Sequence, residues 1–154
     1  TELSENTVLS HKMIMDDVLE RRKTNPSYFP VTIPGMPQMR MTRRVRGLYT
    51  LDDEKAGVAF PDSIGVIPDW RKRGPVYEIP FRTLYGGDVR NLVAAGRCIT
   101  VTDAMWDISR VIPACAVTGQ AAGFAAALSS DFPALDVSNL RDRLSESGVK
   151  TCLN

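Results

Sequence analysis

The residues most suited to chemistry lie in one stretch, residues 91–128, which contains Gly96, Arg97 and Arg110. A short apolar segment ends at Gly96, where a backbone without a side chain can approach a bound molecule closely. A polar turn that carries Arg97 and Arg110 comes next, followed by a long run rich in alanine and glycine. This order is typical of a site that receives an anionic or electron-rich ligand.

The alanine-rich run predicts a helix that begins close to Val111. Pro113 suits the first turn, because its missing NH breaks no hydrogen bond there and its φ is already helical. The helix start combines unpaired backbone NH groups with the positive end of the macrodipole, and Arg110 adds a full charge. We therefore expect a ligand at Ser109, Arg110, Val111 and Ile112. The pyrimidine edge of a flavin, which gains negative charge on reduction, suits this point, and a substrate carboxylate suits it equally.

The predicted helix also carries a row of small residues. Gly119 and Gly123 are about one turn apart, and Cys115 extends the row toward the helix start. Such a row lets another group approach the helix backbone, either a ligand or a closely packed sheet, and the sequence leaves both open. No G-x-G-x-x-G follows a strand anywhere in the chain, so the usual dinucleotide-binding loop is missing.

The elements that must position these residues follow from periodicity and from breaking residues. Apolar residues at helical spacing predict a first helix over residues 8–23, started by Asn6 or Thr7, and a proline-rich linker follows it. Strands are predicted over residues 39–51, 62–67, 76–82 and 92–95. A short helix over residues 51–57 and a last helix that Asp136 starts and Gly148 ends complete the chain.

The composition fits one globular domain of ordinary size. The chain has 154 residues, of which 44% are hydrophobic and 24% charged, so good packing buries roughly 70% of the unfolded surface. The formal net charge of +1 gives no overall field for nucleic acid or an anionic membrane. The three cysteines include no C-x-x-C motif, which indicates a reducing cytoplasm and neither a disulfide framework nor a zinc site.

Two further features have a structural interpretation. His11 is the only histidine and lies on a predicted helix surface, so no catalytic triad or multi-histidine metal site is expected. Residues 111–128 contain no charged side chain, but their alanine, glycine and proline content favours a helix buried in a globular protein over a membrane span.

The clusters of charged residues outside residues 91–128 also have a structural interpretation. A basic sheet face that pairs with nearby acids or with an anionic substrate explains the arginines of the strand at 39–51 better than a nucleic-acid-binding strand does: Arg40, Arg43, Arg44 and Arg46. The run of residues 71–73 is most simply a solvated loop. Asp103 and Asp107 could bind a ribityl hydroxyl or hold Arg110, and both roles stay open.

Four motifs together resemble one family, the FAD-dependent oxidoreductases of the glutathione-reductase-like superfamily, in the branch distantly similar to fumarate reductase flavoproteins. That branch shows N-L-x-x-A-G-R, then S-R-V-x-P-x-C-x-x-x-G-Q-A-A-G, with Y-x-I-P-Y-R and R-R-I-x-G-x-Y-x-L further upstream. The matching residues here are 91–97, 109–123, 77–82 and 43–51. The motifs stand in the same order and extend from about Met39 to Gly148.

The resemblance implies an α/β fold that forms the C-terminal part of a two-domain FAD-binding oxidoreductase. Residues 1–38 would be an N-terminal helix and linker, residues 39–90 a β-rich piece of the substrate domain, and residues 91–154 the last strand and long helix of the FAD domain. It places Gly96 and Arg97 at the ribityl and phosphate region of FAD. It also places Arg110, Val111 and Ile112 at the isoalloxazine, with Arg110 as the catalytic candidate.

The family's N-terminal half, with its glycine-rich loop, is absent from the sequence. We therefore expect a missing FAD-binding half or partner chain, a homo-oligomer or swapped assembly, and no nucleic-acid, membrane or metal partner. The complete enzyme would transfer hydride between an unidentified small substrate and FAD. The isolated chain is expected to be inactive, and a non-catalytic fragment or partner subunit that binds no flavin is the alternative.

Two observations bear on the chain's surroundings. The start at Thr1 without a methionine fits a processed product or part of a longer chain, and the polar, acidic first residues argue against an export signal. An anion-binding or nucleic-acid-binding module built on the arginine strand is the remaining alternative, which salt-sensitive binding would support.

Overall fold

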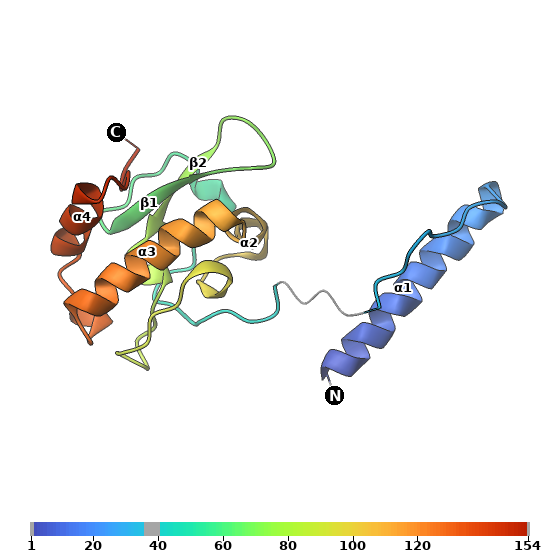
Figure 1. Cartoon of the computed structure of the whole chain (residues 1–154), viewed down its shortest axis with the longest axis horizontal. Coiled ribbons are helices and arrows are strands. Elements are labelled where there is room, and N and C mark those ends of the chain that lie inside the picture. The colour runs from blue at the N-terminus through green and yellow to red at the C-terminus, as the bar shows by residue number, and fades with distance from the viewer. Residues whose placement is uncertain (1, 36–40, 154) are drawn as a thin grey trace. The chain divides into compact units, whose positions relative to one another are not determined.

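The computed structural model describes residues 2–35 and 41–153, and the chain divides into two compact units between residues 40 and 41 (Figure 1). The first unit holds helix α1 (Glu2–Thr24) and the proline-containing segment after it. The second holds the other helices and the strands of the described residues. The predicted boundaries at residues 38 and 90 stay predictions.

Helix α1 confirms the first predicted helix but starts well before residue 8. Glu2 and Glu5 in the first turn and basic residues in the last turn complement the helix dipole. Thr7 lies inside the helix, where its hydroxyl donates a 2.7 Å hydrogen bond to the carbonyl of Leu3 instead of capping the start. No described residue of α1 is buried. His11 is exposed, and its Nε2 lies 3.1 Å from the carbonyl oxygen of Pro34.

Strands β1 (Ser63–Pro68) and β2 (Val76–Pro80) confirm two of the predicted strands, and they pair with each other as an antiparallel hairpin. Ile67 lies opposite Tyr77, and the register shifts between Ser63 and Val66, which marks a bulge. Most residues of both strands are buried. The sheet is therefore a small internal support for the helices.

Helix α3 (Ile112–Leu128) lies along β1, as Figure 1 shows in orange beside green. Its buried residues, Ala114, Thr118, Ala121 and Ala125, form the packed face. Gly65 of β1 permits this approach, because a Cβ there would collide with the side chain of Val117. Small side chains on both elements thus bring the helix close to the sheet.

Helix α4 (Val137–Glu146) contacts both α3 and β1. The carboxylate of Asp136 accepts a 2.9 Å hydrogen bond from the amide of Ser138 at its start. Gly148 takes a φ of +82°, and the amide of Val149 bonds to the carbonyl of Leu144 at 3.0 Å. The predicted cap and stop of this helix are therefore confirmed.

The core of the second unit joins the hairpin to the helices. It contains Leu51, Ile64, Ile79, Phe81, Leu84, Ile99, Val101, Met105, Ile108, Leu140 and Leu144, all with no exposed surface. The buried carboxylate of Glu78 lies within it and accepts backbone hydrogen bonds from Phe60 at 2.7 Å and Leu153 at 2.8 Å. This carboxylate ties the C-terminal tail to β2.

The turn predicted between Gly96 and α3 contains a helix, α2 (Asp103–Ser109). The hydroxyl of Thr102 accepts from the amide of Met105 and caps its start. Arg110 is the C-cap residue of α2, and its amide donates to the carbonyl of Trp106 at 3.1 Å. The apolar side chains Met105, Trp106 and Ile108 are buried, and this burial explains a helix where the polar residues suggested only a turn.

The strand predicted over residues 39–51 is wrong for residues 41–50, and its first two residues, Met39 and Arg40, lie outside the described part of the chain. The segment still makes backbone hydrogen bonds. The amide of Val45 donates to the carbonyl of Cys98, the amide of Leu48 to that of Tyr85, and the amide of Tyr49 to that of Arg82. Because these acceptors belong to separate turns, no ladder repeats, and only Leu51 forms a bridge, parallel to Val101.

The strand predicted over residues 92–95 does not form either. The amide of Ala94 donates to the carbonyl of Leu84 at 2.7 Å, but residues 92–95 belong to neither strand of the described sheet. A strand needs a neighbouring strand for a regular ladder, and the described sheet, which contains only β1 and β2, supplies none for residues 92–95. The α/β class is confirmed at its coarse level, as helices with one two-stranded sheet.

Candidate functional site

Gly96 opens the site and contacts the middle of α3. It takes a φ of +65° at the start of the 3₁₀ turn Gly96–Cys98. Its amide donates a 2.8 Å hydrogen bond to the hydroxyl of Thr118. A Cβ on Gly96 would lie 3.3 Å from the Sγ of Cys115. Both the backbone angle and the close approach therefore favour glycine at this position.

The start of α3 is open to the surroundings. Val111 is the N-cap residue, Pro113 lies in the first turn as predicted, and Ile112 is 86% exposed. Ser109, the last residue of α2, is only 1% exposed, and its hydroxyl oxygen has no hydrogen-bond partner among the described residues. The thiol of Cys115 contacts the carbonyl of Arg110 at 3.5 Å.

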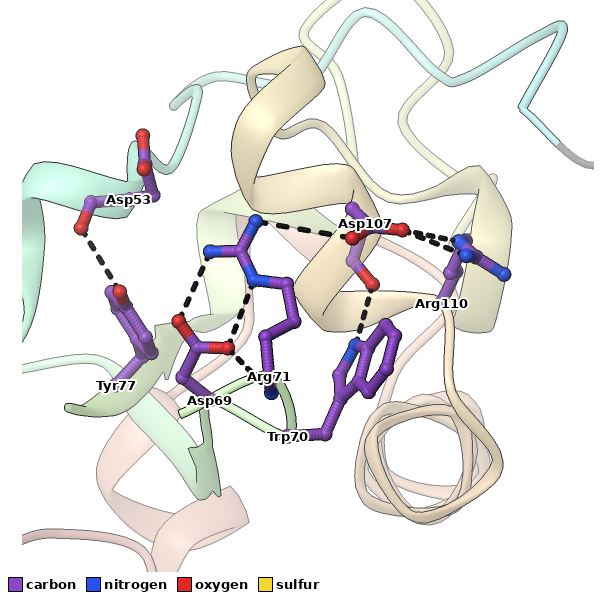
Figure 2. Close-up of polar contacts among 7 residues, drawn as sticks. All are labelled: Asp53, Asp69, Trp70, Arg71, Tyr77, Asp107 and Arg110. Atoms are coloured by element: carbon purple, nitrogen blue, oxygen red, sulfur yellow. Dashed lines mark hydrogen bonds and ion pairs between the residues drawn. The ribbon is translucent and has the colours of Figure 1, made fainter. Parts of the chain in front are cut away.

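Arg110 is bound to Asp107 of α2, as Figure 2 shows. Its Nε and Nη2 both donate to the same carboxylate oxygen, at 3.0 and 2.7 Å. The structure therefore decides between the two roles left open for Asp107, because this carboxylate holds Arg110. Asp103 instead lies 3.0 Å from Arg44, whose guanidinium also covers the ring of Trp106 at 5.0 Å.

Arg97 is exposed, and its carbonyl oxygen accepts a 2.8 Å hydrogen bond from the indole NH of Trp106. Its positive charge acts on the nearby thiol of Cys115. Burial raises the pKa of Cys115, and the charge of Arg97 opposes that shift. Gly96 and Arg97 therefore lie beside α3, near Thr118 and Cys115.

The small-residue row of α3 faces away from the sheet. Nothing lies within 4 Å of the position that a Cβ would take on Gly119 or Gly123. The exposed residues on this face are Ile112, Pro113, Ala116, Gly119, Gln120, Gly123, Ala126 and Ala127. Packing against the described sheet, one of the two explanations that the sequence left open for these glycines, is therefore wrong, and we call this surface the open face of α3.

Sequence reasoning missed the contribution of the β1–β2 loop. Arg71 was interpreted as solvated, but it binds both Asp69 and Asp107. The indole NH of Trp70 donates to the carbonyl of Asp107 at 2.9 Å. The only sequence signal was an acid two residues before an arginine, which is common in exposed loops and carries no information on a partner 36 residues away.

The profile of the family described as FAD dependent oxidoreductase matches residues 8–144. The chain belongs to this family. No curated protein and no solved structure matches the chain.

Several features of this FAD dependent oxidoreductase chain fit a bound flavin nucleotide. The start of α3 faces outward, the hydroxyl of Ser109 is buried without a partner in the described residues, and Gly96 brings bare backbone to the same helix. Helix starts and glycine backbones suit electron-rich and phosphate groups. The residues that would hold the cofactor are Gly96, Arg97, Ser109, Arg110, Val111 and Ile112.

Two further results concern other kinds of site in the oxidoreductase chain. Within residues 2–35 and 41–153, no group of three histidine, cysteine, aspartate or glutamate residues could hold a metal ion. No single helix of these residues is long and apolar enough to cross a membrane. Only α2 and α3 taken together reach that length and composition, and they are bent by 89° where they meet.

Proposed function

We propose that this chain is the C-terminal part of a flavin-dependent enzyme that transfers hydride between a small substrate and FAD. The FAD group, when bound, supplies the hydride chemistry, and the protein supplies orientation and charge. The observation that carries the proposal is the outward-facing start of α3 beside the buried, unpartnered hydroxyl of Ser109. A substrate carboxylate remains a second candidate occupant of the same point, because it needs the same donors.

Arg110 is the proposed catalytic residue. Two of its nitrogens are bound to Asp107, and in Figure 2 the third points away from that carboxylate. A guanidinium has five NH donors, so donors remain for an anionic or electron-rich group. Arg110 would thus stabilise negative charge on the ligand, and the negative charge of Asp107 would partly offset the positive charge of Arg110.

We further propose that another polypeptide completes the FAD site. The open face of α3 is the surface that it would cover, because its small side chains allow another element to pack closely against the helix. That polypeptide is an N-terminal FAD-binding half, a partner chain, or a second copy in a swapped assembly. We also propose a cytoplasmic location, because the three cysteines are free and thiols stay reduced in that compartment.

The alternative is a non-catalytic fragment or partner subunit that binds no flavin by itself. The same open surface favours it for the chain in isolation. A purified chain with a flavin absorption band would support an independent flavin protein, and a colourless chain that gains this band only with its completing polypeptide would support the split site. A colourless chain that stays so in every assembly would count against the flavin proposal.

Substitution of Arg110 tests its role in the assembled, flavin-loaded enzyme. Arg110→Ala should lower turnover or flavin affinity, and Arg110→Lys should restore part of the loss because it keeps the charge but not the fork of donors. Arg143→Ala is the matched control, since Arg143 also pairs at i,i+3 spacing, with Glu146 on the exposed side of α4. Unchanged kinetics and flavin content in Arg110→Ala would refute the assignment.

A further inference from the structure

The hold on Arg110 is one-sided. Both of its hydrogen bonds go to Oδ1 of Asp107, so that one edge of the planar guanidinium is fixed and the other is left free. The side chain of Arg110 is 21% exposed, which places this pair at the surface of the unit. The orientation of the free edge therefore depends on the orientation of the Asp107 carboxylate.

Asp107 is itself held from the opposite side by the β1–β2 loop. Its second oxygen, Oδ2, lies 3.8 Å from Nη1 of Arg71. Its backbone carbonyl accepts the 2.9 Å hydrogen bond from Trp70. Figure 2 shows Arg71 on one side of the Asp107 carboxylate, Arg110 on the other, and Trp70 below Asp107. One carboxylate thus joins two elements that are far apart in the sequence.

The loop is anchored at its own base by Asp69. This carboxylate has no exposed surface, and it binds Nε and Nη2 of Arg71 at 3.0 Å each and the amide of Arg71 at 2.9 Å. The amide of Asp69 in turn donates to the carbonyl of Pro75 at 2.9 Å, across the base of the loop. Negative and positive side chains therefore alternate from the end of β1 to the start of α3, in the order Asp69, Arg71, Asp107 and Arg110.

We propose that the β1–β2 loop positions Arg110 through Asp107, with Arg71 and Trp70 as positioning residues for the candidate flavin or carboxylate site. An exposed ion pair alone holds two long side chains weakly. Here the guanidinium of Arg71 is fixed by two hydrogen bonds to Asp69, so its ion pair with Asp107 has one defined direction and restricts the Asp107 carboxylate. The consequence for function rests on the proposed role of Arg110, whereas the positioning is a property of the chain alone.

The positioning is tested first without flavin, on the 154-residue chain. The NMR signal of the Arg110 Nε proton is assigned by its loss in Arg110→Lys, and its exchange with water is measured. Exchange should accelerate several-fold in Asp107→Asn and by a smaller factor in Arg71→Gln and Trp70→Phe. Arg71→Lys should recover little, because a single ammonium cannot bind Asp69 and Asp107 in the same way.

Lys72→Gln is the matched control, because it removes the same charge from the same loop at a residue that is exposed. It should leave the Arg110 signal unchanged. The Nε signal of Arg90, which pairs with Asp131, reports whether each variant remains folded. Equal exchange of the Arg110 proton in wild type, Asp107→Asn and Arg71→Gln would overturn the inference.

The second arm uses the assembled, flavin-loaded enzyme. Arg71→Gln should lower the flavin reduction potential and kcat more than Lys72→Gln does, since it also loosens Arg110. Equal shifts in the two variants would show an effect of charge alone and overturn the positioning role. A changed Arg110 signal in the chain together with wild-type potential and kcat would uphold the positioning and refute the proposed role of Arg110 at the flavin.

Discussion

The hydroxyl of Thr118, in the middle of α3, accepts a 2.8 Å hydrogen bond from the amide of Gly96. The same hydroxyl lies 3.1 Å from each of the carbonyls of Ala114 and Cys115, and Thr118 is 1% exposed. This contact fastens the turn that carries Arg97 to the helix whose start forms the candidate site. A partly buried amide that loses its acceptor is costly, so the contact matters for stability as well as for position.

Thr118→Val should therefore lower the free energy of unfolding by about 1–3 kcal/mol, because the shape is kept and the amide of Gly96 loses its acceptor. Thr118→Ser keeps the hydroxyl and is the control, with a smaller loss from the missing methyl group. Chemical denaturation followed by circular dichroism measures both. Equal losses in the two variants would assign the effect to packing of the methyl group and not to the hydrogen bond.

Alanine on the open face of α3 should stabilise the isolated chain. Gly119→Ala and Gly123→Ala each add about 1 kcal/mol of helix propensity, and neither Cβ meets an atom within 4 Å. Gly96→Ala is the contrasting variant and should cost about 1–2 kcal/mol at its left-handed φ. Thermal unfolding of the three variants checks the opposite signs.

The same two glycines test whether another polypeptide covers this face. If the completing polypeptide packs closely on the open face of α3, Gly119→Ala and Gly123→Ala should weaken the assembly while they stabilise the chain alone. Flavin content of the assembled protein gives the readout. Full flavin content in the double variant would place the contact elsewhere.

Asp69 should make the stability of the chain depend on pH in the acidic range. Its hydrogen bonds from Arg71 hold its pKa below the usual 3.8, although desolvation opposes them. The unfolded chain therefore takes up this proton at a higher pH than the folded chain does. The stabilisation is fully present well above the unfolded pKa of 3.8 and is lost progressively as the pH falls through the lower folded pKa.

Unfolding curves for wild type and Asp69→Asn across this range check the prediction. The variant should be less stable than wild type near neutral pH, and the difference should shrink on acidification. A difference that stays constant, or that grows as the pH falls, would contradict this account of the Asp69–Arg71 pair.

The thiols should differ in reactivity. Cys98 is exposed, whereas burial raises the pKa of Cys115 above its usual 9.0 and so lowers its thiolate fraction. An alkylating reagent at mildly alkaline pH should modify Cys98 several-fold faster, as peptide mass spectrometry can show. In denaturant the two rates should converge, and faster modification of Cys115 in the folded chain would contradict the burial argument.

The local elements were the predictable part of the fold. Pro113 placed the start of α3, and Asp136 with Gly148 placed both ends of α4, because caps and stops act through residues within one turn. Strands β1 and β2 were predicted for a similar reason, since each is a short apolar run next to a polar loop, but their pairing was not predicted. The motif residues at 91–97 and 109–123 likewise indicated the family that the profile match shows.

The misplaced elements depend on partners distant in the sequence. Residues 41–50 have the alternation of a strand, but the turns at Arg82, Tyr85 and Cys98 supply their acceptors and prevent a ladder. Residues 92–95 have a strand's composition without a neighbouring strand in the described part of the chain. Residues 103–109, where the sequence predicts a polar turn, form α2 because their apolar side chains are buried in the core.

The sequence by itself determined the family, the helix that carries the candidate site and the residues at its start. These features depend on backbone geometry and capping, which neighbouring residues control. The tertiary structure alone decided that Asp107 holds Arg110, that Trp70 and Arg71 hold Asp107, and that Gly119 and Gly123 face outward. The physical reason is that a side chain's partner is set by the packing of separate elements, and the packing of α3 on β1 fixes which of its faces is buried.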